Sequence, residues 1–340
     1  MKRSLVLLIS FLTGLLLVSH GQQYPSRQAT LEGVPIMAGA TDPEIEKFDY
    51  YHYIFVDRAI VIQHDPTLAA DRHELLLFLD GTQLSGDPHI GKGPVAFFRT
   101  AEDLGYHLIY LSYPNDVPPS AACNDDADRN AFERFRMAII AGGHFHNSLK
   151  DFTVTRADSI ENRLRKLLLY LKRTRRRENW EEFLNADGSI KWPSITLVGQ
   201  SQGGGEAALM AIRHEVGRVI CFGAPKDYNH VHAEPAAWYR QESATPKNRF
   251  FALNHDQDYQ AFCPPPQQME NLIALGLNKF GAPVDPTQEK PPYRHTRIFT
   301  TDFPGRKLGS PEAHRVFLSR SDIFKPVWTY VLSEPVEKGR

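Results

Sequence analysis

The sequence has little net charge, few cysteines and a single long hydrophobic run. Among its 340 residues, 39 Lys and Arg nearly balance 40 Asp and Glu, so the formal net charge is −1. A chain without a strong overall field has no general attraction for nucleic acid, and we expect no nucleic-acid partner. No cysteine lies near the amino terminus, which argues against a lipid-anchored lipoprotein. No internal repeat or low-complexity linker is present, which excludes a repeat array.

The long hydrophobic run lies within residues 1–21, MKRSLVLLISFLTGLLLVSHG. Lys2 and Arg3 form a basic start, Leu5 to Val18 is apolar, and small residues follow, which is the pattern of a secretory signal peptide. The apolar part is shorter than the about 20 residues that cross a bilayer. We therefore expect cleavage, a secreted or periplasmic product without stable membrane insertion, and one domain over residues 22–340.

Strand-like and helix-like patterns alternate along the rest of the chain. Continuous apolar runs at 74–81, 106–114 and 194–199 predict buried strands, and further strands are predicted at 218–225, 249–258 and 295–302. Residues 51–63 alternate as one or two antiparallel edge strands. Helical spacing falls between these runs at 94–105, 158–173, 204–215 and 319–332. This alternation predicts an α/β fold with a mostly parallel central sheet and helices on both faces.

Three other segments carry weaker signals. Residues 115–157 are rich in Asp, Pro and Gly, and we expect a loop or cap insertion over the active face. The basic run at 172–177, KRTRRR, is interpreted as a solvated helix end. Cys221 lies in a predicted buried strand and is interpreted as a free core thiol. We expect Cys123 and Cys263 to form a disulfide, although the odd number of cysteines leaves this pairing open.

The strongest local signal is the segment GQSQGGG at 199–205, which contains the pattern G-x-S-x-G around Ser201. In that pattern the serine occupies a strained turn between a strand and a helix, with its hydroxyl at the carboxyl edge of the sheet. A Cβ at either flanking glycine would strike the packed strand or helix. A phosphate-binding turn is the alternative, but no lysine follows the glycines as a P-loop requires.

These features resemble the α/β-hydrolase superfamily, and GQSQGGG is close to the elbow of cutinase-like and secreted bacterial esterases. The resemblance extends from about residue 74 to the carboxyl end, in strand order as well as in motif. It implies a catalytic serine, acid and histidine in that chain order. The serine is then Ser201.

The resemblance also indicates where the other two members lie. The acid is expected in the loop after the strand at 249–255, where Asp258 is favoured over Asp256. The histidine is expected between the last strand and the final helix, which indicates His314, with His295 as the weaker candidate. The oxyanion hole is expected from the backbone N–H groups of Gln202 and Thr82, with Gln83 behind Thr82. Relatives often carry His-Gly at the place of Asp80-Gly81, which leaves the local hydrogen bonding open.

Two His-x-His pairs, 144/146 and 230/232, could in principle share a metal. Neither pair has a cysteine or a clearly placed third ligand, both fall in predicted loops, and HExxH is absent. We therefore expect no metal and no cofactor in catalysis.

Together these expectations describe a secreted serine hydrolase that acts on a small-molecule, lipid or polymer ester through an acyl-enzyme on Ser201. The same triad would serve an acyltransferase or a peptidase. The competing class is a hydrolase-like scaffold that binds a ligand without catalysis. The sequence carries no signal for oligomeric state.

Overall fold

The structure, a computed structural model, describes residues 33–55, 72–83 and 94–336. The chain divides into two units, Met1–Leu31 and Glu32–Arg340, and the fold described below is that of the second. The expected signal peptide lies outside the described residues, and so does the predicted edge-strand segment at 56–63. Within the described residues, no helix combines the length and the apolar character that crossing a bilayer requires.

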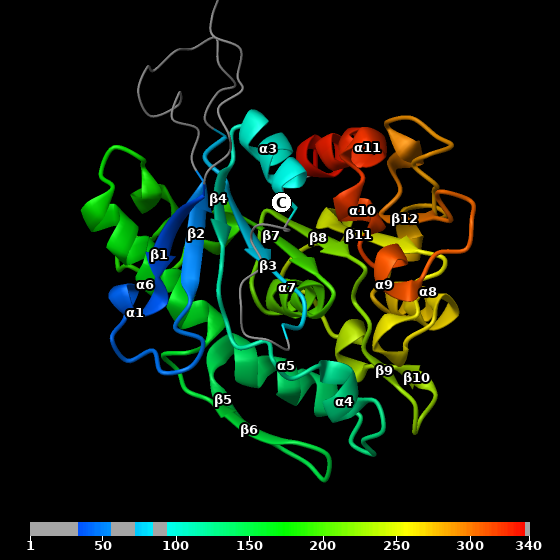
Figure 1. Ribbon diagram of the computed structural model, residues 1–340, viewed down its shortest axis with the longest axis horizontal. Helices are drawn as coiled ribbons and strands as arrows, with labels where there is room; N and C mark the ends of the chain where they lie inside the picture. Colours follow the sequence, from blue (N-terminus) through cyan, green and yellow to red (C-terminus); the bar gives the residue numbers. More distant parts are fainter. Residues whose placement is uncertain (1–32, 56–71, 84–93, 337–340) are drawn as a thin grey trace, which may run out of the picture. The chain divides into compact units, whose positions relative to one another are not determined.

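An eight-stranded sheet in the order β1-β2-β4-β3-β7-β8-β11-β12 forms the centre of the fold (Figure 1). Two strands at one edge are antiparallel, β1 (Val34–Met37) and β2 (Tyr51–Phe55). The rest pair in parallel, which confirms the predicted mostly parallel sheet. They are β3 (Leu75–Leu79), β4 (His107–Tyr110), β7 (Ile195–Gln200), β8 (Arg218–Phe222), β11 (Phe250–His255) and β12 (Ile298–Thr301).

The position of β3 follows from its composition. All five residues, LLLFL, are fully buried, and the strand pairs with β4 on one side and β7 on the other. A strand covered on both faces reads as an unbroken apolar run, which is the pattern that predicted this strand. The central position of β3 and β7 places their carboxyl ends side by side.

Helices cover both faces of the sheet (Figure 1). On one face, α3 (Val95–Asp103) packs against α11 (Ser321–Ser333), with the rings of Phe97 and Trp328 5.8 Å apart. On the other lie α5 (Ala131–Ala141), α6 (Ile160–Thr174) and α7 (Gln202–Arg213), and α5 packs against both α6 and α7. Short helices complete the fold: α1 (Ala38–Thr41), α4 (Pro119–Cys123), α8 (Pro265–Ala274), α9 (Ser310–Ala313) and α10 (Val316–Ser319).

The segment at 115–157 is more regular than predicted. It contains α4, α5 and a hairpin of β5 (Gly143–His146) and β6 (Asp151–Val154). The prediction of an irregular insertion is wrong for α5, because its apolar residues Phe132, Phe135 and Ile139 follow helical spacing and are buried. The start of the segment contacts the loop after β11, since Asn124 donates through Nδ2 to the Ala261 carbonyl at 3.3 Å.

The three cysteines are free and buried, so the expected disulfide between Cys123 and Cys263 is not formed. Burial raises the pKa of the Cys221 thiol to about 12 and that of Cys263 to about 12. Cys123 ends helix α4 and does not lie in a loop, which was the premise of the expected pairing. These residues behave as small apolar core side chains.

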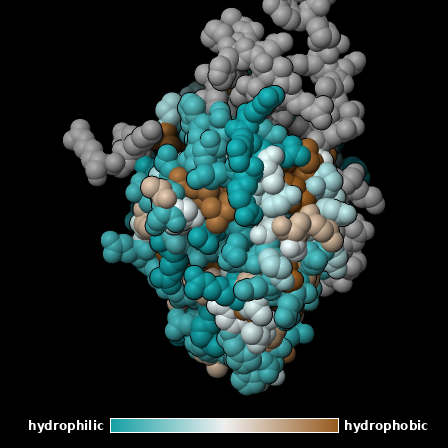
Figure 2. All heavy atoms as spheres, turned by 90° about the vertical axis from the view of Figure 1, so that its left-hand side faces the viewer, coloured by the Kyte–Doolittle hydropathy of each residue, from teal (hydrophilic) through white to brown (hydrophobic). Residues whose placement is uncertain are grey.

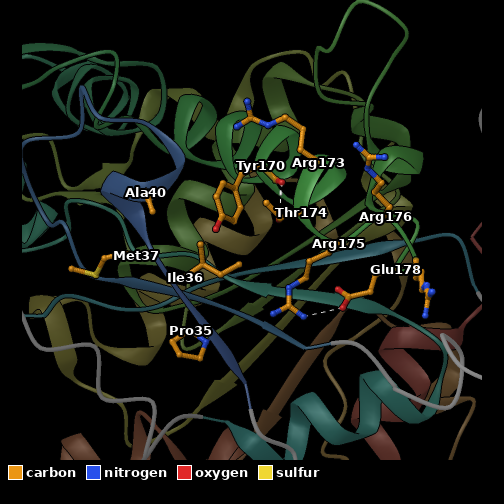
Figure 3. Close-up of a pocket in the computed structure, with 11 residues that line it drawn as sticks. Pro35, Ile36, Met37, Ala40, Tyr170, Arg173, Thr174, Arg175, Arg176 and Glu178 are labelled. Carbon is orange, nitrogen blue, oxygen red and sulfur yellow. Dashed lines mark hydrogen bonds and ion pairs between the residues drawn. The ribbon is translucent and has the colours of Figure 1, made fainter.

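A cavity of about 700 Å³ lies between β1 and the carboxyl end of α6, where the basic run emerges (Figure 3). Pro35 and Ile36 line one side, and Arg175 turns toward Glu178, with Nη1 2.9 Å from Oε1. The surface on this side of the fold is mostly hydrophilic, with separate hydrophobic groups (Figure 2). No residue that lines this cavity belongs to the candidate site described next.

Candidate active site

Ser201 sits at the turn between β7 and α7, in the backbone conformation that a nucleophile elbow requires. Its φ is 54° and its ψ is −118°, a region that residues other than glycine rarely adopt. The amide of Ser201 donates to the Phe222 carbonyl of β8 at 2.9 Å, and its carbonyl accepts from the amide of Gly204 at 3.1 Å. The turn is therefore anchored to the neighbouring strand and to the first turn of the helix.

The two glycines of the motif are required by the packing. A Cβ at Gly199 would collide with the Gly203 carbonyl, and a Cβ at Gly203 would collide with the Leu79 carbonyl of β3. Only a residue without a side chain lets α7 begin this close to β3 and β7. The sequence-based reason for both glycines agrees with this geometry.

The Ser201 side chain is partly exposed and faces the loop after β3. A Cβ built on Gly81 would lie 3.1 Å from Ser201 Cβ and 3.7 Å from Ser201 Oγ. Within the described residues the hydroxyl makes no hydrogen bond to another protein group. Its oxygen is thus neither packed in the core nor committed to a structural contact.

The structure brings Asp258 and His314 together. His314 Nδ1 lies 2.7 Å from Asp258 Oδ2, and the Asp258 side chain is fully buried. The imidazole packs on Gly223, where an added Cβ would lie 2.8 Å from Nδ1. Gly223 directly follows Phe222, whose carbonyl accepts the hydrogen bond from the Ser201 amide, so the ring lies beside the elbow. The structure shows no hydrogen bond from Ser201 to the ring, a contact that often tightens only when substrate binds.

The two weaker candidates lie elsewhere. Asp256 is exposed, although it is only two residues from Asp258. The side chain of His295 is 66% exposed, and its Nδ1 lies 2.7 Å from the Glu334 carboxylate. Neither side chain contacts the pair of Asp258 and His314 among the described residues.

Lys226 is the second charged partner of Asp258, and the sequence analysis missed it. Its Nζ lies 2.7 Å from Asp258 Oδ1, so each carboxylate oxygen faces a different partner. The Lys226 side chain is 5% exposed and also donates to the Gln260 carbonyl at 3.3 Å. Lys226 follows shortly after β8, at the carboxyl edge of the sheet, where ligand-binding residues of parallel sheets collect. This position, just after a predicted parallel strand, was the sequence signal that could have identified Lys226.

The charges set the protonation states of this group. Burial acts to raise the pKa of Asp258, but the His314 hydrogen bond and the Lys226 charge hold that pKa below its ordinary value. Burial lowers the pKa of His314, and Lys226 lowers it further against the opposing effect of Asp258. An imidazole with a lowered pKa is neutral at neutral pH and is able to accept a proton.

We expect replacement of Lys226 to move the pH profile of ester hydrolysis. In Lys226→Met one cause of the lowered His314 pKa is removed, so that pKa rises and the acidic limb of kcat/KM shifts to higher pH. Lys226→Arg keeps the charge and should leave the limb near that of the wild type. The measurement is kcat/KM for a nitrophenyl ester over pH, with thermal unfolding as the check on folding. An unmoved limb in a folded Lys226→Met protein would mean that Lys226 is structural only.

The two residues whose backbone N–H groups are predicted to form the oxyanion hole contact each other through their side chains. Thr82 Oγ1 donates to Gln202 Oε1 at 2.7 Å, which joins the loop after β3 to the start of α7. The Gln83 amide donates to the Asn115 carbonyl at 3.1 Å. The amides of Thr82 and Gln202 make no hydrogen bond to protein in the described part of the chain. Two unpaired N–H groups thus flank Ser201, one of them at a helix N-terminus.

Asp80 organises this loop. Its carboxylate accepts from the Tyr110 hydroxyl at 2.6 Å and from the Gly81 amide at 2.8 Å. The Tyr113 hydroxyl donates to the Asp80 carbonyl at 2.5 Å, and Asn115 Nδ2 donates to the Gly81 carbonyl at 2.6 Å. Four hydrogen bonds therefore hold the Asp80-Gly81 turn and fix the loop beside Ser201.

A buried cluster of ion pairs around Arg136 contacts the start of α7, next to the elbow. Arg136 of α5 forms ion pairs with Glu206 of α7 and with Asp227, and all three side chains are at most 2% exposed. Arg136 also donates to the Gln202 carbonyl at 3.0 Å. Burial raises the pKa of Glu206 to about 7, in spite of the neighbouring guanidinium. The sequence analysis missed this cluster, because its members come from three separate segments.

The mostly parallel sheet with an elbow serine between a central strand and its helix is the α/β-hydrolase fold. No family model and no curated protein matches the sequence. Solved structures similar to the chain include a bacterial heroin esterase (12% identity, TM-score 0.40, 89% of this chain and 84% of that one). Others are an S-formylglutathione hydrolase from Agrobacterium tumefaciens (12%, 0.40, 83% and 88%) and an esterase from Thermogutta terrifontis (13%, 0.38, 91% and 96%). At these scores the fold assignment depends on the strand order and the elbow.

Proposed function

We propose that the protein is a serine hydrolase that cleaves carboxylic esters through an acyl-enzyme on Ser201. The observation that carries this proposal is the buried Asp258–His314 pair, 2.7 Å apart, beside a serine held at positive φ. A serine hydroxyl is a weak nucleophile at neutral pH and needs a base with an orienting acid. In this proposal Ser201 is the nucleophile, His314 the base and Asp258 the orienting acid.

In the first step, Ser201 Oγ attacks the acyl carbonyl and His314 Nε2 accepts the hydroxyl proton. Asp258 accepts the Nδ1 hydrogen bond, which fixes the tautomer and stabilises the imidazolium. The C–O bond to the alcohol then breaks, and the imidazolium gives its proton to the leaving oxygen. Water, activated by the same imidazole, attacks the acyl-enzyme and releases the acid and free Ser201.

Negative charge develops on the carbonyl oxygen in both tetrahedral intermediates. The amides of Gln202 and Thr82 are the donors that would stabilise it, because both are unpaired among the described residues and adjoin Ser201. The Asp80 network holds the Thr82 donor in place before substrate arrives. A donor that is already oriented lowers the barrier without a reorganisation cost in the reaction.

The proposed substrate is a small-molecule, lipid or polymer ester. After cleavage of the signal peptide, the mature protein would act outside the cytoplasm. Transfer to an alcohol or cleavage of an amide would use the same groups. The principal alternative is a scaffold that binds ligand without turnover. The alternative does not explain why an unpaired hydroxyl, a buried acid and an imidazole share one site.

A fluorophosphonate probe tests the proposal directly. We expect one equivalent to attach to Ser201 in the wild type, as identified by peptide mass spectrometry, and none to attach in Ser201→Ala. Ser194→Ala is the matched control, since its hydroxyl lies at the other end of β7 and donates to the Lys191 carbonyl. A folded protein that leaves the probe unreacted would support the non-catalytic scaffold. Labelling of Ser201 without turnover of any ester would favour transfer or amide cleavage.

A further inference from the structure

The hairpin β5–β6 lies next to helix α5 (Figure 1). It carries three exposed side chains of metal-ligating type, and none of them belongs to the candidate active site. His144 and His146 lie two residues apart on β5, and Asp151 on β6 lies opposite His146 in the antiparallel register. Residues two apart on a strand point to the same side. Their ligand atoms all lie within 4.8 Å of one another. The sequence analysis placed both histidines in a loop and therefore found no third ligand.

The carboxylate lies between the two imidazoles. His144 Nε2 is 3.4 Å from Asp151 Oδ1, and His146 Nδ1 is 3.4 Å from Asp151 Oδ2. The two rings are nearly parallel, with an interplanar angle of 6° and centroids 6.2 Å apart. One ring nitrogen of each histidine and one carboxylate oxygen therefore lie within 4.8 Å of one another, a spacing that a shared cation could bridge.

A hydrogen bond orients one of the ligands. His144 Nδ1 lies 2.9 Å from Thr153 Oγ1, and Thr153 is the residue opposite His144 on β6. When Nδ1–H donates to this hydroxyl, the lone pair stays on Nε2, the nitrogen that faces Asp151. Metal-bound histidines are typically held in this way through their other ring nitrogen.

The backbone beneath the cluster is fixed although the ligands are exposed. The opposite face of the hairpin presents Phe145 and Phe152, whose rings lie 5.4 Å and 5.2 Å from the ring of Phe135 on α5. The turn is closed by Asn147, whose Oδ1 accepts from the amides of Leu149 and Lys150. A rigid platform reduces the entropy that ordering of the ligands would cost.

We propose that this hairpin binds a divalent d-block cation of the Zn²⁺ class through His144, His146 and Asp151. Two imidazoles favour Zn²⁺, Ni²⁺, Cu²⁺ or Co²⁺ over Mg²⁺ and Ca²⁺, which prefer all-oxygen ligands. Three protein ligands leave at least one position for water or for a ligand from another molecule. The site is independent of the proposed hydrolase chemistry, because it shares no residue with the elbow or with Asp258 and His314.

The test is Zn²⁺ titration of the full chain by calorimetry, with Co²⁺ absorption spectra as a second readout. We expect one equivalent to bind at this site, and His146→Gln and Asp151→Asn to weaken binding at least roughly tenfold, the smallest loss typical even of an outer-shell partner. His232→Gln is the matched control, since His232 belongs to the other His-x-His pair and its Nε2 faces the Ala127 carbonyl at 2.8 Å. This variant should bind like the wild type.

Three outcomes would overturn the proposal. They are the absence of Zn²⁺ binding at micromolar concentrations, unchanged affinity in both His146→Gln and Asp151→Asn, and an equal loss of affinity in His232→Gln. Circular dichroism of each variant separates loss of the ligand from loss of the hairpin. Because the readout is metal binding, failure of the hydrolase proposal would leave this result unaffected.

Discussion

Replacing His314 with Ala should lower kcat/KM for a nitrophenyl ester by on the order of 10⁴-fold or more, because Ser201 loses the base that accepts its proton. The fold should remain intact, because Lys226 still neutralises the buried Asp258 carboxylate when the imidazole is removed. The measurement is steady-state kinetics on protein whose thermal unfolding matches that of the wild type.

The double variant His314→Ala with Ser201→Ala separates a catalytic unit from two independent effects. Residues of one triad act together, so the double variant should be about as slow as either single variant. His295→Ala is the matched control and should keep wild-type activity, because its ring pairs with Glu334 on the surface. Full activity in His314→Ala, or effects that multiply in the double variant, would contradict the assignment.

Replacing Arg136 with Met should reduce the free energy of unfolding by about 3–5 kcal/mol, the range found when one partner of a buried ion pair is removed. Glu206 and Asp227 would then face each other in the interior without a cation. The loss should appear as a lower urea midpoint with an unchanged dependence on urea concentration. The activity of the folded fraction should also fall, since Arg136 holds the Gln202 carbonyl beside the elbow.

The control for Arg136→Met is Arg306→Met. Arg306 pairs with Glu312, but both side chains are more than half exposed, and such pairs contribute about 0–1 kcal/mol. Combining Arg136→Met with Glu206→Gln and Asp227→Asn should restore part of the lost stability, because the buried charges are then removed together. Equal losses in Arg136→Met and Arg306→Met would show that the buried cluster has no special role.

The parts of the fold that the sequence predicted are those with a local signal. The unbroken apolar run of β3 and the helical spacing of α6 identify buried elements without tertiary information. The motif around Ser201 is also a local signal, because its five residues carry the strand-to-helix turn, although the contact of Gly203 with Leu79 joins distant segments. The same local logic misjudged α5, whose helical pattern is flanked by segments rich in Asp, Pro and Gly.

The features that the sequence missed depend on contacts between distant segments. β1 is too short to show a period, and it is an edge strand defined by its pairing with β2. Lys226 lies 2.7 Å from a carboxylate that is far along the chain, and no pattern near Lys226 announces that partner. The cluster of His144, His146 and Asp151 similarly needs the β5–β6 register, which a two-residue spacing alone cannot supply.

The division of Asp258 between two partners has a consequence for a chain that lacks the imidazole. Lys226 is contributed by the segment after β8, whereas His314 is contributed by the segment after β12. Loss of His314 therefore leaves the buried carboxylate with a cationic neighbour, and the site would lose its base without gaining an unpaired buried charge.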